Sequence, residues 1–269
     1  MTKSASDTSA VRTLQEAVHE GSPTPLYYQI YVILRDKITS RVYPDGSLLP
    51  SEHELEKIFG VSRITAKRAL DELASEGLVT RQRGRGTRVT FKGPYSSLAG
   101  DMHGLLEDLL TIIKETDVEV LEFDYVPASP STADALKIKT GDMVQKAVRV
   151  RRRKGTPLAY VTTYVPEDIG RSYTLEELKD NPLVALIERD GHKISSARQT
   201  ITATLADSTL AEALEIRVGS PLLKVIRVVL DENDKPVELI TVHYRPDLYQ
   251  IHLNLTRARA NTKNFWSTT

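Results

Sequence analysis

The stretch from Leu49 to Thr90, LPSEHELEKIFGVSRITAKRALDELASEGLVTRQRGRGTRVT, constrains the fold of this chain more than any other. Ser51 and Glu54 have capping-box spacing, in which each side chain hydrogen-bonds the backbone N–H of the other residue. The sequence therefore predicts a helix that begins after Ser51 and ends at Gly60, because Gly tolerates the left-handed conformation found just past helix ends. Ser62 is the expected N-cap of a second helix.

The second helix is predicted to carry an apolar stripe of Ile64, Ala69, Leu70 and Leu73 and to end at Gly77. Two short strands, LVTRQ and TRVT, follow around a tip of alternating Arg and Gly. Two helices joined by so tight a turn are typical of a helix-turn-helix, which places its second helix in a DNA major groove. The glycine-rich hairpin is typical of a wing.

Positive charge is concentrated in the same stretch. From residue 63 to residue 92 there are eight basic and three acidic residues, a net charge of +5, whereas the whole chain has 36 of each. The eight are Arg63, Lys67, Arg68, Arg81, Arg83, Arg85, Arg88 and Lys92. Phosphate contacts supply much of the affinity of DNA-binding proteins. A basic helix pair can also be an ordinary solvated surface, but the order of capping box, turn, helix and wing favours DNA binding.

These residues resemble the winged helix-turn-helix of the GntR family of bacterial transcription regulators, from about Pro25 to Val89. The resemblance implies DNA contacts from the start of the recognition helix and from the wing tip. The predicted DNA-binding residues are Ser51, His53, Ser62, Arg63, Thr65, Lys67, Arg68, Arg83, Gly84 and Arg85. His53 departs from the family, which usually has an arginine there. An imidazole is a weaker phosphate or guanine partner than a guanidinium, so the contact of His53 stays open.

The C-terminal half reads as a mixture of strands and short helices. Strands are predicted at 118–126, 143–153, 157–165, 198–205, 221–231 and 236–245, and helices at 132–136, 174–179, 183–189 and 209–216. Thr174 with Glu177, and Thr209 with Glu212, repeat the capping-box spacing. The polar run 231–235 is a hairpin connection, so its flanking strands should be antiparallel. The predicted fold class is α+β.

One strand, MVQKAVRVRRR, has chemistry of its own. Alternation places Val144, Val148 and Val150 on one face, and Gln145, Arg149, Arg151 and Arg153 on the other. Two guanidiniums at positions i and i+2 lie about 7 Å apart. They can bind a carboxylate or a phosphate. A solvated strand face would produce the same pattern, and the pattern alone leaves both readings open.

The segments RVRRRKGTPLAYVTTYVPEDI and GSPLLKVIRVVLDENDKPVELITVHYRPDLYQIHL resemble the effector-binding UTRA domain of the HutC branch of GntR regulators. The resemblance implies a chorismate-lyase-like fold, with a six-stranded antiparallel sheet, and a small acidic or phosphorylated ligand. It implies that Arg149 and Arg151 bind the anion and that Glu238 and Tyr244 are polar site residues. Glu238 and Tyr244 are six residues apart, so alternation also places both on one strand face.

This chain departs from the sugar-phosphate-binding members at three positions. Val161 stands where those members tend to have a glutamate, and Pro182 and Val184 replace a Ser-x-Tyr. Exchanging hydroxyl-reading groups for apolar ones predicts a less hydroxylated, more apolar acid as the effector, with carboxylic acids as candidates.

Several other kinds of protein are not expected. The chain has no cysteine, so disulfides and thiolate chemistry are excluded. Its six histidines have no metal-binding spacing, and no nucleophile elbow or phosphate-binding loop occurs. The sequence contains no run of 18 apolar residues, and its start lacks the apolar core of a signal peptide. We therefore expect no cofactor, metal or membrane partner, and a soluble protein in the bacterial cytoplasm.

Together these patterns predict a homodimeric transcriptional repressor that binds a pseudo-palindromic DNA operator. A small anionic metabolite is expected to modulate this binding. The predicted parts are a mobile tail (1–24), the winged helix-turn-helix domain (25–92), a linker (93–108), the effector-binding and dimerisation domain (109–255) and a C-terminal tail (256–269). An apolar stripe after Asp101 would serve domain packing or a dimer contact. The alternative is a chorismate-lyase-like enzyme tethered to DNA, although no acid–base pair stands out.

Overall fold

The computed structural model describes residues 18–19, 21–82, 84–92 and 116–251, together with the backbone of residues 255–260 and 263–268. The chain divides into two compact units, Met1–Gly93 and Pro94–Thr269, and each is described by itself. The predicted linker, the helix after Asp101 and most of the predicted N-terminal tail lie outside the described residues.

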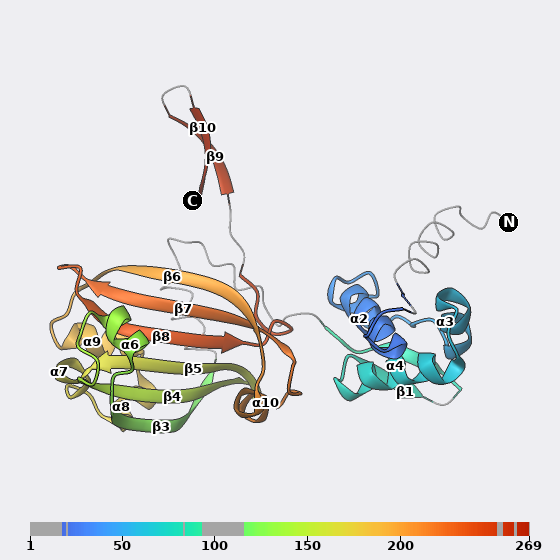
Figure 1. Cartoon of the computed structure of the whole chain (residues 1–269), viewed down its shortest axis with the longest axis horizontal. Helices are drawn as coiled ribbons and strands as arrows, with labels where there is room; N and C mark the ends of the chain where they lie inside the picture. Colours follow the sequence, from blue (N-terminus) through green and yellow to red (C-terminus); the bar gives the residue numbers. More distant parts are fainter. Residues whose placement is uncertain are drawn as a thin grey trace. The chain divides into compact units, whose positions relative to one another are not determined.

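In its described residues, the N-terminal unit has three helices followed by a hairpin (Figure 1). Its elements are α2 (Leu26–Thr39), α3 (Glu52–Phe59), α4 (Arg63–Ser75), β1 (Val79–Gln82) and β2 (Gly86–Val89). The capping box is present: the Ser51 hydroxyl accepts from the Glu54 N–H, and the Glu54 carboxylate accepts from the Ser51 N–H. Gly60 ends α3 with φ of 65°. The predicted helix-turn-helix is confirmed.

A continuous apolar core fixes α3 and α4 against α2. Ile30, Leu34 and Ile38 of α2 pack with Leu55 of α3 and Leu70 of α4, and all five are at most 1% exposed. Burying one such side chain stabilises the fold by about 1.5–3 kcal/mol. The core therefore holds the turn between α3 and α4 in one geometry.

One predicted core residue is wrong. Ile64 is 80% exposed, whereas Ala66, Ala69, Leu70 and Leu73 face the core. The prediction fails because Ile64 lies in the first turn of α4, where the stripe that faces α2 begins only at Ala66. The side chain of Ile64 therefore adds nothing to the core of this unit.

The wing is anchored at its base. β1 and β2 pair antiparallel from Val79 opposite Val89 to Gln82 opposite Gly86. Val79 and Val89 are buried in the same core as the helices, at 3% and 1% exposure. The base of the hairpin is thus fixed, and its tip projects beyond the core.

The C-terminal unit is built on one six-stranded antiparallel sheet in the order β3-β4-β5-β8-β7-β6, seen side by side in Figure 1. Its strands are β3 (Asp117–Pro127), β4 (Met143–Arg153), β5 (Thr156–Pro166), β6 (Ile194–Leu205), β7 (Pro221–Asp231) and β8 (Pro236–Tyr244). The helices among its described residues are α6 (Pro130–Leu136), α7 (Glu167–Gly170), α8 (Leu175–Asp180), α9 (Leu183–Arg189) and α10 (Ser208–Leu214). The predicted α+β class is confirmed.

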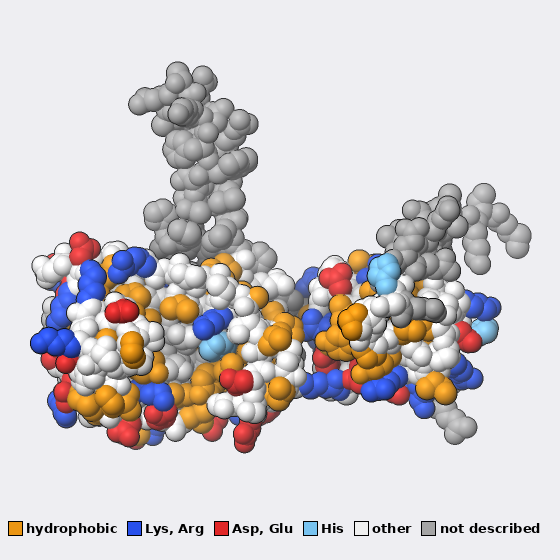
Figure 2. Space-filling view, in the orientation of Figure 1, with side chains coloured by type: hydrophobic (Ala, Val, Ile, Leu, Met, Phe, Trp, Pro, Cys, Tyr) orange, Lys and Arg blue, Asp and Glu red, His pale blue; other side chains and the backbone are white. Residues whose placement is uncertain are grey.

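The two faces of the sheet are covered differently. One part of the inner face, around Ala147, Val165 and Val229, packs under α7, α8 and α9, and another part packs against Leu248, Tyr249 and Ile251, which follow β8. The outer face packs in part against α6 and α10. Between these two helices the outer face is shallow and mostly uncharged in Figure 2. Its central strands alternate buried and half-buried residues, as in Val161, Thr162 and Thr163 of β5.

Three local predictions need correction. α10 is capped by the Asp207 side chain, which accepts from the Leu210 N–H, and not by a box of Thr209 and Glu212. Asp207 lies one position before the helix, so it reaches the free N–H groups that Thr209 cannot. The short helix α7 was not predicted. The segment predicted only as a tail contains β9 (Leu255–Ala260) and β10 (Lys263–Thr268), which pair as a hairpin.

Candidate DNA-binding face and effector site

The recognition helix α4 begins with a hydroxyl cap. The Ser62 hydroxyl accepts from the Thr65 N–H at 3.2 Å and lies 2.8 Å from the Thr65 hydroxyl. The first of these contacts satisfies one of the free N–H groups at the start of the helix. Arg63 and Lys67, on the same first turns, are exposed. The local sequence thus presents two cations at the end of the helix that a major groove receives.

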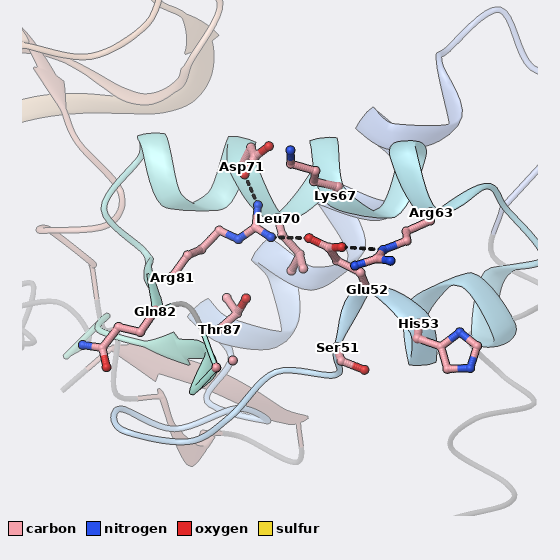
Figure 3. Close-up of a pocket in the computed structure, with 12 residues that line it drawn as sticks. Ser51, Glu52, His53, Arg63, Lys67, Leu70, Asp71, Arg81, Gln82 and Thr87 are labelled. Carbon is pink, nitrogen blue, oxygen red and sulfur yellow. Dashed lines mark hydrogen bonds and ion pairs between the residues drawn. The ribbon is translucent and has the colours of Figure 1, made fainter.

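A groove of about 660 Å³ lies between the start of α3, the exposed side of α4 and the wing (Figure 3). Of the predicted residues it brings together Ser51, His53, Arg63, Lys67 and Gly84. The helices and the wing therefore enclose one basic concave face, although these residues come from three separate segments of the chain.

A chain of ion pairs crosses the floor of this groove and was not predicted. Asp71 pairs with Arg81, Arg81 pairs with Glu52, and Glu52 pairs with Arg63 (Figure 3). The Arg63 Nε lies 2.9 Å from the Glu52 Oε2. The hydrogen bond from Arg63, with further help from Arg81, lowers the pKa of the Glu52 carboxyl. Glu52 therefore stays ionised and holds the guanidinium of Arg63 in place.

The remaining predicted DNA-binding residues occupy varied positions. His53 is exposed, and its Nδ1 lies 3.3 Å from the Glu56 carboxylate. The Arg68 guanidinium lies over the Tyr27 ring, 3.8 Å from its centroid, and does not line the groove. Gly84, with φ of 76°, and Arg85 are exposed at the wing tip. Arg83 lies outside the described residues.

In the C-terminal unit the four predicted effector-binding residues are all buried. Exposed fractions are 3% for Arg149, 9% for Arg151, 2% for Glu238 and 4% for Tyr244. Strand register places all four on the inner face. Arg149 is paired with Val161, and Val161 is paired with Val242. Arg151 shares a face with Arg149, and Glu238 and Tyr244 share a face with Val242, because residues an even number of positions apart on a strand point to the same side. The reading of this arginine face as a solvated strand surface is therefore wrong.

The two arginines are poorly compensated. The Arg149 Nη2 donates to the Thr163 Oγ1 at 3.3 Å, but its buried Nε has no hydrogen-bond partner among the described residues. The Arg151 Nη1 donates to the Thr116 Oγ1 at 3.2 Å. Burial lowers the pKa of both side chains, that of Arg151 to about 10. Buried cations with neutral partners are costly, so this face is suited to receive an anion.

Sequence reasoning missed further polar residues of the same face. Arg227 of β7 is 6% exposed, and its Nε donates to the Gln199 Oε1 at 2.8 Å. The hydroxyl of Tyr173, between α7 and α8, donates to the Gln145 Oε1 at 2.7 Å. The sequence contained a pattern that could have identified Arg227. It lies on the same face of its strand as the apolar Leu223 and Val225, and that strand is predicted to be buried.

Two negative findings concern only the part of the chain that the structure describes. There, no helix is long and apolar enough to cross a membrane. In the same residues, no group of three or more His, Cys, Asp or Glu is arranged to hold a metal ion.

Comparison with known proteins accounts for both units. Residues 26–89 match the bacterial regulatory proteins of the gntR family, and residues 114–250 match the UTRA domain. The HTH-type transcriptional regulator Rv0792c of Mycobacterium tuberculosis is 33% identical over 238 residues, 87% of each chain. The HTH-type transcriptional repressor NagR of Bacillus subtilis is 27% identical over 232 residues, 86% of this chain and 95% of that protein.

The fold is shared with a solved structure, that of the possible transcriptional regulator YydK from Bacillus subtilis. The TM-score is 0.52 at 24% identity, over 87% of this chain and 99% of that one. These relatives are transcription regulators and not enzymes, so the hypothesis of a DNA-tethered enzyme is not retained. A winged helix-turn-helix with a basic groove, joined to a six-stranded UTRA domain, makes this chain a DNA-binding transcription regulator of the GntR family, HutC subfamily.

Proposed function

We propose that this regulator is a homodimeric repressor whose affinity for a pseudo-palindromic operator changes when a small anionic metabolite binds the inner face of the UTRA domain. Two recognition helices related by a twofold axis would read successive major grooves. The effector would act through its different affinity for two arrangements of the dimer. A repressor sign is supported by relatives such as NagR, which carries that word in its name.

The observation that carries the proposal is the buried Arg149 guanidinium, whose Nε lacks a partner among the described residues, next to Arg151 on the same strand face. A carboxylate or phosphate oxygen would satisfy that donor and the charge together. Glu238 and Tyr244 lie on the same face and are proposed to contact the polar part of the ligand.

The apolar character predicted for the effector has local support. Val161 is 4% exposed and is paired directly opposite Arg149, so an apolar side chain borders the proposed anion site. A ligand rich in hydroxyls would leave those hydroxyls unpaired against Val161, which costs binding free energy. We propose a carboxylic acid with an apolar body in preference to a sugar phosphate.

The test begins by selecting an operator from a random duplex library with the purified protein. Anisotropy titrations of that operator are then repeated with aliphatic and aromatic carboxylates and with sugar phosphates, while thermal shift reports binding. A carboxylate should weaken operator binding in the wild type but not in Arg149→Met. The matched control is Arg198→Met, which removes an exposed arginine of β6. If a sugar phosphate binds much more tightly than every carboxylate, the proposal that the effector is a carboxylic acid with an apolar body is wrong.

A further inference from the structure

We propose that Arg227 is a third anion-binding arginine of the inner face and that the effector carries two acidic groups, one bound by Arg149 and Arg151 and the other by Arg227. This inference rests on the proposed function of the UTRA domain. It adds a binding residue and narrows the ligand to a dianion with separated charges, of which a dicarboxylate is the simplest class.

The charges of the inner face do not balance. Arg149, Arg151 and Arg227 are all less than 10% exposed, and Glu238 is the buried carboxylate on the same face. Among the described residues of this face, three buried guanidiniums against one buried carboxylate leave a net charge of +2. None of the three arginines has a carboxylate oxygen within 4 Å among the described residues, and their hydrogen-bond partners there are neutral.

Glu238 lies between two of the arginines. Burial raises the pKa of its carboxyl, and Arg149 on one side and Arg227 on the other oppose that rise. Tyr244 is similarly placed, because it lies on the same strand, β8, between the strands of Arg151 and Arg227. Both arginines oppose the rise that burial causes in the pKa of its phenol. The three arginines, Glu238 and Tyr244 therefore form one electrostatically connected cluster, which we call the arginine cluster.

The spacing within the arginine cluster separates two binding positions. β4 and β7 are three strand spacings apart, because β5 and β8 lie between them. Three spacings of the usual size amount to about 14 Å. Gln199 of the edge strand β6 accepts from the Arg227 Nε and Nη2, which holds the guanidinium away from β4. One carboxylate bound by Arg149 and Arg151 thus leaves Arg227 for a second acidic group.

A purely structural role accounts poorly for Arg227. Burying a charged group is costly unless an opposite charge compensates it, and a buried arginine whose direct hydrogen-bond partner is a neutral glutamine costs stability without forming a full ion pair. Such a residue is expected where an anionic ligand repays the cost on binding. The ligand-free protein should therefore gain stability when Arg227 is removed.

The experiment uses the full-length protein and the α,ω-dicarboxylates of four to eight carbons, each compared with its own monomethyl ester. Inorganic phosphate, sulfate and a sugar phosphate complete the panel. In the wild type at least one diacid should bind about tenfold or more tightly than its ester, the factor expected for one charged contact. In Arg227→Met this ratio should fall towards one, and in Arg198→Met it should not change.

Thermal unfolding without ligand gives a second readout that does not depend on finding the effector. Arg227→Met should raise Tm, by about 2–4 °C for each kcal/mol in a protein of this size. A lower Tm in Arg227→Met than in the wild type, together with equal affinity of the wild type for each diacid and its ester, would overturn the inference. The proposed function would remain intact in that case, because monoanions would still release DNA. If the wild type bound phosphate or the sugar phosphate more tightly than every diacid, both negative charges of the ligand would belong to one phosphate group. That result would also overturn the inference. If no small anion in the panel binds or releases DNA, both proposals fail.

Discussion

Replacing Arg63 by alanine is the sharpest test of how the groove reads DNA. The Arg63 side chain is 74% exposed, and its partner is the Glu52 carboxylate. An exposed ion pair contributes about 0.2–1 kcal/mol, so Arg63→Ala should leave the fold intact and Tm nearly unchanged. Any large effect on DNA binding then belongs to the interface.

The expected loss follows from the geometry of the contact. Glu52 binds the Arg63 guanidinium through Nε, which leaves the two terminal nitrogens available to a guanine edge. A bidentate contact of this kind discriminates by about 1–3 kcal/mol. Each recognition helix should therefore lose about 5- to 150-fold in affinity for the selected operator, with a smaller loss on random duplex. Anisotropy titrations at fixed salt measure both.

The double variant Arg63→Ala/Glu52→Gln separates two causes of the loss. In Arg63→Ala the Glu52 carboxylate keeps only Arg81 as a partner and would face DNA phosphates with less compensation. If the missing base contact causes the loss, the double variant stays weak. Recovery of affinity in the double variant, or an unchanged affinity in Arg63→Ala, would refute the base-contact role.

Four further predictions concern other parts of the chain. Arg85→Ala should weaken binding and reduce the slope of log K against log salt by about one, as loss of a phosphate contact requires; a slope equal to that of the wild type would exclude that contact. Ile64→Ala should leave Tm unchanged, since Ile64 is 80% exposed, but it should lower the affinity for operators in which a thymine methyl lies within reach of residue 64. An equal loss of affinity for operators with and without that methyl group would argue against the contact. Leu34→Ala should lower the free energy of unfolding by about 2–5 kcal/mol in denaturant titrations, because it empties a core position. The hydrogen bond from Arg189 is the main cause that lowers the pKa of the Glu177 carboxyl to about 2, so its contribution to stability is present above the usual pKa of 4.5 and is lost as the pH falls towards 2. Glu177→Gln should therefore reduce the loss of stability between pH 4.5 and pH 2. An identical loss in the variant and the wild type would show that Glu177 does not cause it.

The sequence predicted the helix-turn-helix well because its signals are local. The capping box of Ser51 and Glu54, Gly60 after α3 and the Ser62 cap each act within four residues and need no knowledge of the rest of the chain. Strand periodicity was equally informative, since β4 and β7 were predicted with their observed bounds. Local rules failed at the start of α4 and of α10, where packing and a preceding aspartate decided the outcome.

The sequence predicted which residues share the inner face of the sheet, but it did not predict their burial. Alternation alone placed Arg149 and Arg151 on one face of β4, but it left open whether that face meets water. Only the folded structure shows that both are buried, at 3% and 9% exposure. The likeness to a UTRA domain favoured a binding face over a solvated one; the structure shows that the face is buried, and its role in anion binding stays a prediction.

What the sequence by itself determined is the identity of the elements, because caps, turns and periodicity are properties of neighbouring residues. What only the tertiary structure decided is which charges meet. Glu52, Asp71 and Arg81 come from α3, α4 and the wing, and their ion pairs with Arg63 exist only after those segments pack. Arg227 and Arg149 likewise share one buried face although their strands are three spacings apart. Coulomb interactions depend on distance in space, and the pairing of distant segments sets that distance.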